Sequence, residues 1–213
     1  MQALDTTIVN TAIPAMAVSL GEDPLRMRSV VVAYVLSVAA CIPLSGWLAD
    51  RFGVRNTYFS SIIIFTLASL GCAFSQSLEQ LLFFRVAQGI GGALLLPVGR
   101  LAMLKVIPRS QFLSAMSLMS LAGLVGPLIG PTLGGWLVEV TTWHWIFLIN
   151  IPMGLLGVLV TFKAMPNVTE PTVQKFDFSG FLLLVIAMIG MSLGIESFSS
   201  TYSSAWFSIV LVV

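Results

Sequence analysis

The sequence GWLADRFG at residues 46–53 forms a short charged segment between two long apolar windows. These windows, at 29–49 and 56–78, contain no charged residue. Because roughly 20 apolar residues are needed to cross a bilayer as a helix, the pattern predicts two membrane-spanning helices joined by a tight turn. Gly46 is expected to permit close approach of a neighbouring helix, and Gly53 is expected to permit the turn itself.

The composition predicts that the solvent of this chain is a bilayer. Hydrophobic residues make up 57% of the 213 residues and charged residues only 9%, whereas an ordinary soluble domain carries about 25% charged residues. The formal net charge of +1 leaves no basic field, so no nucleic-acid partner is predicted. The two cysteines, Cys41 and Cys72, lie in apolar runs without disulfide or metal spacing. The sequence also contains no nucleophile triad, phosphate loop or metal cluster, so an enzyme is not predicted.

Apolar windows of spanning length recur along the whole chain. Charge-free windows lie at 29–49, 56–78, 110–138 and 140–162, with a slightly shorter one at 178–195. Two more, at 1–20 and 80–99, hold the single charges Asp5 and Arg85, and a last apolar run begins at residue 205. The sequence therefore predicts an all-α polytopic membrane protein with seven helices and the beginning of an eighth. Both chain ends lie inside apolar runs, which predicts an incomplete chain with a truncated first helix.

The window that contains Arg85 is only marginally able to insert. A central Arg costs about 2.5–3.5 kcal/mol, while each large aliphatic or Phe side chain returns about 0.3–0.6 kcal/mol. The Leu, Ile and Phe side chains of this window together return roughly 3 kcal/mol. Arg85 is therefore expected to face the protein interior.

The loops between the windows predict the orientation of the chain. One side carries seven basic residues, which are Arg51, Arg55, Arg100, Lys105, Arg109, Lys163 and Lys175. The other side carries Arg26 and Arg28. Because positive charge is enriched in cytoplasmic loops, the first side is predicted to be cytoplasmic and the first helix to run outward.

Six motifs occur in order between residues 4 and 180. They are LDTTIVNTAIP at 4–14, GWLADRFGVR at 46–55, RVAQGIGGA at 85–93, GPLIGPTLGG at 126–135, WHWIFLINIPMG at 143–154 and FDFSG at 176–180. Together they resemble the 14-helix drug:proton antiporter branch of the major facilitator superfamily. Two positions depart from the pattern of that branch: Val54 stands where a basic residue is common, and His144 stands where Arg is common. Val54 leaves the cytoplasmic charge network one cation short, and His144 adds a titratable group at the outer surface.

The resemblance implies a major facilitator fold. It divides the chain into an N-terminal six-helix bundle at 1–163, a cytoplasmic loop at 164–177, and helix seven with part of helix eight at 178–213. It implies proton-coupled efflux of drugs or other amphipathic small molecules across the inner membrane, driven by the proton gradient without a cofactor. The implied partners are the bilayer, the small-molecule substrate, protons and a C-terminal bundle that the chain lacks. An exporter of an endogenous metabolite and a non-transporting fragment of a disrupted gene remain alternatives.

The first candidate site consists of Asp5, Asn10, Arg85 and Gln88. An intramembrane carboxylate is costly and usually functional, so Asp5 is a candidate proton or cation site; it could instead fix helix packing through neighbouring polar side chains. Arg85 stays protonated in proteins, so it can tune a carboxylate but cannot carry the proton. Helix counting places Asp5 about 22 Å and Arg85 about 12 Å from the outer ends of their helices. A direct pair and a water-mediated link are therefore both open.

Two further motifs carry structural hypotheses. The loop motif residues Gly46, Asp50, Arg51, Gly53 and Arg55 could form a conformational latch, with Asp50 meeting a helix N-terminus or an Arg of a neighbouring loop, or could act only as a determinant of topology. In the fifth helix, Gly126, Gly130 and Gly134 recur every four residues and line one face, beside Pro131 and Gly135. Such small faces let membrane helices approach closely. The resemblance implies a seal against ion leak there, and generic helix packing is the alternative.

Overall fold

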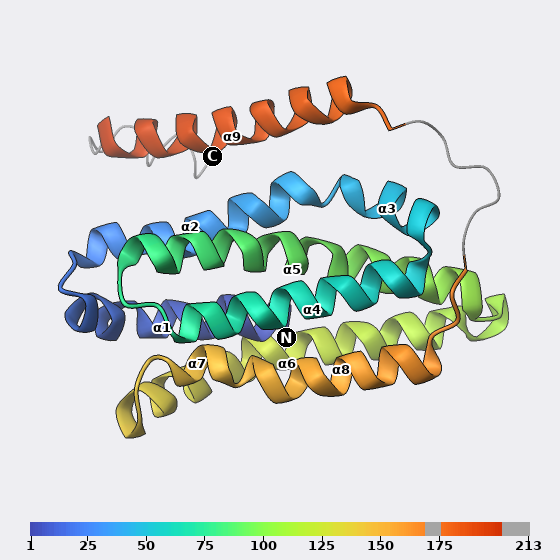
Figure 1. Ribbon diagram of the computed structural model, residues 1–213, viewed down its shortest axis with the longest axis horizontal. Helices are drawn as coiled ribbons and strands as arrows, with labels where there is room; N and C mark the ends of the chain where they lie inside the picture. The colour runs from blue at the N-terminus through green and yellow to red at the C-terminus, as the bar shows by residue number, and fades with distance from the viewer. Residues whose placement is uncertain (169–175, 202–213) are drawn as a thin grey trace, which may run out of the picture. The chain divides into compact units, whose positions relative to one another are not determined.

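The computed structural model describes residues 1–168 and 176–201, and every regular element within them is a helix. The helices are α1 Gln2–Leu20, α2 Pro24–Cys41, α3 Leu44–Phe52, α4 Val54–Ala73, α5 Leu78–Val106, α6 Arg109–Val140, α7 Trp145–Leu148, α8 Asn150–Ala164 and α9 Phe178–Thr201 (Figure 1). The chain divides into two compact units, Met1–Gln174 and Lys175–Val213. The first unit holds α1 to α8, and the second holds α9.

Six of the described segments are long and apolar enough to cross a membrane. They are Gln2–Leu20, Pro24–Cys41, Val54–Ala73, Leu78–Val106, Arg109–Val140 and Trp145–Ala164. They confirm the first six predicted windows. The seventh window falls in α9, where Phe178–Met188 is a shorter apolar helix. The predicted eighth helix, from residue 205, lies outside the described residues.

Two predicted windows are each divided into two helices. The window at 29–49 contains most of α2 and most of α3, which are separated at Ile42 and Pro43. Proline has no backbone N–H to donate and its ring crowds the preceding turn, so a continuous helix is interrupted there. The window at 140–162 contains the single turn α7 and then α8, with Ile149 between them. Both divisions position side chains of the sites described below.

The turns at one end of the bundle have clear local causes. Helix α1 ends at Gly21, which adopts a left-handed conformation with φ of 67°, and Asp23 then caps α2 by accepting a hydrogen bond from the Leu25 N–H at 2.7 Å. Pro24 at the first position of α2 needs no hydrogen-bond partner there. The Ser77 side chain caps α5 in the same way through the Gln80 N–H. These caps fix where α1, α2 and α5 begin or end.

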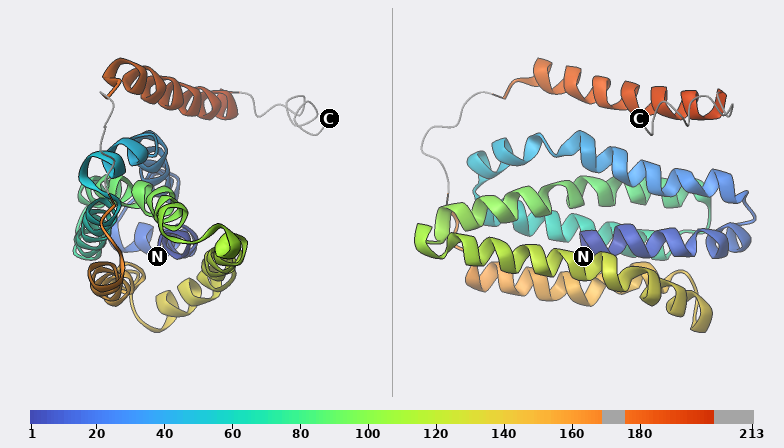
Figure 2. Two further views of the ribbon diagram at one scale, coloured as in Figure 1. Left: turned by 90° about the vertical axis from the view of Figure 1, so that its right-hand side faces the viewer. Right: turned by 180° about the vertical axis from the view of Figure 1, so that it is seen from behind.

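Within the first unit, α5 packs against α4 and α2, while α1 packs against α6 and α2. The largest group of buried apolar side chains surrounds α1 and includes Ile8, Met16, Leu81 and Phe147. Helix α1 begins about halfway along the bundle, as the N-terminal mark in Figure 1 and the reverse view in Figure 2 show. Its far end extends past the first turn of α5 in both views. The first turn of α1 therefore lies deep inside the bundle.

Candidate proton and substrate site

Asp5 and Arg85 form a direct buried ion pair. Asp5 lies in the first turn of α1 and is 1% exposed, and Arg85 lies on α5 and is fully buried. The Arg85 Nη1 donates to Asp5 Oδ2 at 2.6 Å. Helix counting left a difference of about 10 Å between the depths of the two residues. The extension of α1 beyond the start of α5 reduces that difference, and of the two arrangements left open by the sequence the structure shows the direct pair.

Arg85 is held from three sides. Its Nε donates to the Val30 carbonyl of α2 at 3.2 Å, and its Nη1 also donates to Gln88 Oε1 at 2.7 Å. Because Arg85 and Gln88 are three residues apart, they lie on the same face of α5. The guanidinium lies 4.2 Å from the ring centre of Tyr34, which is a favourable position for a cation over an aromatic face. The guanidinium therefore keeps several favourable contacts besides Asp5.

Asp5 Oδ1 accepts two amide hydrogen bonds. One comes from Gln88 Nε2 at 3.0 Å and the other from Asn150 Nδ2 at 3.2 Å. Gln88 was predicted as part of this site, but Asn150 was not. Asn150 is fully buried at the first position of α8. The available signal was an amide in an otherwise apolar window, within the motif at 143–154.

Asn10 does not join this cluster. Its side chain is exposed, and its Nδ2 donates to the Thr6 carbonyl of the same helix at 3.2 Å. Five residues of an α-helix turn the side chain by about 140°, so Asn10 and Asp5 point to different sides of α1. The structure therefore brings together Asp5, Arg85 and Gln88 of the four predicted residues.

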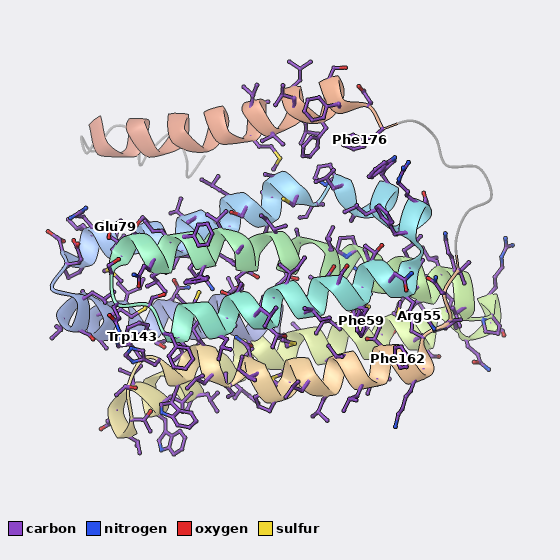
Figure 3. All side chains as sticks on the ribbon, in the orientation of Figure 1. Arg55, Phe59, Glu79, Trp143, Phe162 and Phe176 are labelled. Atoms are coloured by element: carbon purple, nitrogen blue, oxygen red, sulfur yellow. The ribbon has the colours of Figure 1, made fainter. Side chains whose placement is uncertain are left out.

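The loop motif lies at the end of the bundle where Figure 3 labels Arg55 and Phe162, opposite the end with Glu79 and Trp143. Asp50 forms an ion pair with Lys105 in the last turn of α5, with Oδ1 and Nζ 3.3 Å apart. The expected partner of Asp50 was a helix N-terminus or an Arg, so that expectation is corrected. The end of α5 lies beside this loop, and Lys105 is the basic residue that it presents.

The arginines of the loop motif lie over aromatic rings. The Arg51 guanidinium lies 5.3 Å from the centre of the Trp47 ring, and the Arg55 guanidinium lies 5.8 Å from the centre of the Phe162 ring. Gly53 has φ of 87°, as its predicted role in the turn requires. A Cβ at Gly46 would meet no atom within 4 Å among the described residues, so the expected close approach at Gly46 is wrong in this part of the chain.

The glycine face of α6 packs directly on α1. A Cβ at Gly126 would lie 2.7 Å from the Leu4 backbone nitrogen, and a Cβ at Gly130 or Gly134 would overlap Thr7 or Thr11. The Thr7 hydroxyl also donates to the Gly126 carbonyl at 3.3 Å. Three of the five predicted residues of this motif therefore form the contact with α1.

The other two residues of the motif lie away from this contact. Pro131 is exposed, and a Cβ at Gly135 would meet nothing within 4 Å among the described residues. The same helix thus offers glycines with and without a close neighbour, which makes matched substitutions possible.

The sequence pattern of the Major Facilitator Superfamily matches residues 1–211. The chain belongs to the major facilitator superfamily. It is therefore a multi-pass membrane protein of a transporter family and not an enzyme. Membership explains why the six spans, the loop motif and the small face of α6 occur together.

Curated relatives agree with this assignment. A protein of Cronobacter sakazakii is 58% identical over 201 residues, covering 94% of this chain and 42% of the relative. A protein of Salmonella paratyphi B is 56% identical over 206 residues, covering 97% of this chain and 44% of the relative. Both are named "Putative multidrug resistance protein MdtD". The chain thus spans less than half the length of these relatives.

Solved structures show the same fold at low identity. A peptide transporter POT in complex with sulfate has a TM-score of 0.65 and 17% identity, covering 98% of this chain and 46% of that protein. A D-xylose-proton symporter has a TM-score of 0.64 and 16% identity, covering 92% of this chain and 50% of that protein. The helices match the N-terminal half of such transporters.

Proposed function

We propose that the full-length transporter containing this segment exports drugs or other amphipathic small molecules across the inner membrane in exchange for protons. The observation that carries the proposal is the buried carboxylate of Asp5 opposite the permanently charged Arg85, with Oδ2 and Nη1 2.6 Å apart. Buried carboxylates inside membrane proteins are typical of proton pathways and cation sites. The names of the curated relatives favour drugs as the cargo.

In the proposed cycle, Asp5 is the group that gains and loses the proton. Protonation removes the negative charge that faces Arg85, and a buried charge without its counter-ion is strongly unfavourable. The Val30 carbonyl, Gln88 Oε1 and the Tyr34 ring remain as partners of the guanidinium. These contacts limit the cost of protonation, so Asp5 can alternate between its charged and neutral forms. A cationic substrate would compete with the proton for the same carboxylate.

The loop motif is proposed to latch one conformation of the transporter. Asp50 and Lys105 connect the end of α3 to the end of α5, and both side chains are partly accessible. An exposed pair of this kind contributes about 0–1 kcal/mol. Such a small contribution suits a contact that forms and breaks in each cycle. The rocking of one bundle against another, as in other secondary transporters, needs the C-terminal bundle.

The face of α6 formed by Gly126, Gly130 and Gly134 is proposed to seal the bundle beside the carboxylate. Its contacts bring the backbones of α6 and α1 close together along the segment that carries Asp5. A tight contact between small residues leaves little room for water. The seal would prevent protons from bypassing the exchange step.

The proposal is tested by replacing Asp5 with Asn in the full-length transporter and measuring substrate-driven proton movement in inverted membrane vesicles. Asp5→Asn is expected to abolish coupled efflux, because an amide cannot take up and release the proton. Glu139→Gln is the matched control, since Glu139 is an exposed acid on α6. Unchanged coupling in Asp5→Asn, at equal amounts of protein in the membrane, would refute the role of Asp5.

Separate tests are needed for the identity of the exported compound and for the ability of residues 1–213 to transport without the rest of the protein. A panel of cationic drugs and endogenous metabolites, assayed in the same vesicles, separates drug export from metabolite export. Expression of residues 1–213 alone, next to the full-length transporter, tests whether the segment transports by itself. We expect no transport by the segment, because alternating access requires two bundles.

A further inference from the structure

Asn150 connects Asp5 to the junction between α7 and α8. Its Nδ2 lies 3.2 Å from Asp5 Oδ1 and 3.1 Å from Ser69 Oγ of α4. The Ser69 hydroxyl in turn donates to the carbonyl of Phe147 in α7 at 2.9 Å. Asp5, Ser69 and Asn150 are all buried. A continuous chain of hydrogen bonds therefore runs from the carboxylate to the backbone of α7.

The direction of each hydrogen bond in this chain is fixed by its neighbours. Ser69 has one hydroxyl proton, which it gives to Phe147, so its oxygen accepts from Asn150. An ionised Asp5 only accepts, so the Asn150 nitrogen must also face the carboxylate. Both amide protons of Asn150 are then used. Its Oδ1 is buried and has no hydrogen-bond partner among the described residues, and such an unpaired buried acceptor is unfavourable.

Ionised Asp5 needs hydrogen-bond donors around it, whereas protonated Asp5 also needs a hydrogen-bond acceptor. A protonated carboxyl has a proton to donate, whereas Arg85 and the Gln88 Nε2 that face it are donors themselves. Gln88 Oε1 already accepts from Arg85. Among the side chains that donate hydrogen bonds to Asp5, Asn150 has a vacant acceptor oxygen. Rotation of this amide by about 180° brings Oδ1 to the position of Nδ2, where it accepts from the protonated carboxyl.

The same rotation alters the Ser69 hydrogen bond. With Asn150 Oδ1 now facing it, the Ser69 hydroxyl can turn and donate to Asn150, which releases the Phe147 carbonyl. One proton is added at Asp5, and no other covalent bond to hydrogen changes. We propose that Asn150 is a positioning residue that signals the protonation state of Asp5 to the α7–α8 junction through this reversal. The inference rests on the proposed role of Asp5 as the proton carrier.

The other titratable or charged groups that face Asp5 do not replace Asn150 in this role. They are Arg85 on α5, Tyr34 on α2, Cys72 on α4 and the amino group at Met1. Arg85 contacts Oδ2. Among the described residues, the hydrogen bonds to Oδ1 come from Gln88 and Asn150. Asn150 is therefore the connection from this oxygen to α7 and α8.

Infrared difference spectroscopy of the purified full-length transporter, recorded as the pH is lowered, tests the inference. Protonation of Asp5 gives a carboxylic acid band that is absent from Asp5→Asn. In unsubstituted protein labelled with ¹³C-asparagine, we expect a shift of a side-chain amide band with the same pH midpoint as the acid band. Such labelling keeps the test valid even where a variant fails to fold.

Variants then assign the amide band. Asn150→Leu has the same number and branching of side-chain heavy atoms and no hydrogen-bonding group, so the pH-dependent amide shift should disappear. Ser69→Ala should keep the acid band but change the amide shift. Asn56→Leu is the matched control, since the Asn56 amide is exposed at the start of α4 and donates to the Phe52 carbonyl.

The outcomes separate the two proposals. An acid band from Asp5 together with an unchanged asparagine amide band overturns the role of Asn150 and leaves the proposed function intact. A transporter in which no acid band depends on Asp5 overturns the proposed function, and the role of Asn150 with it. An amide shift that persists in Asn150→Leu would also contradict the inference, because another asparagine would then be its source.

Discussion

The contact between α6 and α1 makes a quantitative prediction for Gly126→Ala. The added Cβ would lie 2.7 Å from the Leu4 backbone nitrogen and 2.9 Å from the Ala3 carbonyl carbon. Backbone atoms cannot move aside by rotating a side chain, so α1 itself must shift. Overpacking of this kind costs about 1–3 kcal/mol, while replacing Gly by Ala inside a helix returns about 1 kcal/mol. The net loss for Gly126→Ala is then about 0–2 kcal/mol.

Gly135→Ala is the matched control on the same helix. A Cβ there would meet no atom within 4 Å among the described residues, so this variant gains helix propensity without a clash. The difference between the two variants removes the propensity contribution and leaves about 1–3 kcal/mol of overpacking. For a protein of 150–250 residues, 1 kcal/mol corresponds to about 2–4 °C in Tm, and this value falls as the chain lengthens because the entropy of unfolding grows with residue number. The relatives are more than twice as long as this chain, so 1 kcal/mol corresponds to about 1–2 °C in the full-length transporter. Gly126→Ala should therefore melt about 1–6 °C below Gly135→Ala.

The assay is thermal unfolding of the purified full-length transporter in detergent, with proton leak into proteoliposomes measured in parallel. Gly126→Ala should both lower Tm and raise the leak relative to Gly135→Ala. Equal melting temperatures for the two variants would refute the close packing of α6 on α1. A lower Tm without any increase in leak would keep the packing but contradict the proposed seal.

Three further predictions concern other parts of the chain. Arg85→Lys should reduce coupled transport at least tenfold, although the positive charge is kept. A single ammonium group cannot replace the hydrogen bonds that the guanidinium makes with Asp5 and its neighbours. Full transport activity in this variant would contradict the need for the guanidinium geometry. Gly53→Ala should lower the free energy of unfolding by about 1–3 kcal/mol, because φ at this position is 87°. Gly46→Ala is the control, and equal Tm values for the two variants would count against backbone strain at the turn. Burial lowers the pKa of His144 from its ordinary value, so its contribution to stability is complete above about pH 6.5 and is lost as the pH falls through the lowered value. His144→Gln should therefore slightly flatten the decrease of Tm between pH 7 and pH 5, and an identical pH profile would contradict that assignment.

The length of the apolar windows was enough to predict the six spans, because a membrane helix is determined by residues that are neighbours in the sequence. A helix in lipid must satisfy its own backbone, so a long apolar window is sufficient evidence for it. The window at 29–49 did not reveal where α2 ends, although Pro43 marks the position. A proline inside a membrane helix either bends it or interrupts it, and the packing around it decides which of these occurs.

The candidate site could be predicted only in part. Asp5 and Arg85 were found because each is a single charge in an apolar window, where burial requires a partner. Asn150 was missed because an amide costs less to bury than a charge, so its position in the sequence is less conspicuous. Asn10 was included because it is close to Asp5 in sequence, but the helix turns it to another side of α1.

Distances between helices were the least predictable feature. Residue counting assumes that neighbouring helices begin at the same depth, and α1 and α5 do not. The same limitation affected Asp50, whose partner Lys105 is 55 residues away in the sequence. Gly46 and Gly135 belong to motifs rich in small residues, yet neither meets a close neighbour among the described residues. Which glycine of a motif carries a contact depends on the position of the partner helix.

Helix α1 packs against α5 and α6 through contacts of different chemistry. Its contact with α5 includes the ion pair of Asp5 and Arg85, so one proton on Asp5 would weaken it. Its contact with α6 joins glycines to Thr7, Thr11 and backbone atoms, none of which titrates in the physiological range. Proton uptake would therefore loosen one attachment of α1 and leave the other unchanged. Helices α1 and α6 would then move together as one rigid unit. The boundary between the moving parts of the transporter would lie inside this bundle as well as between the two bundles.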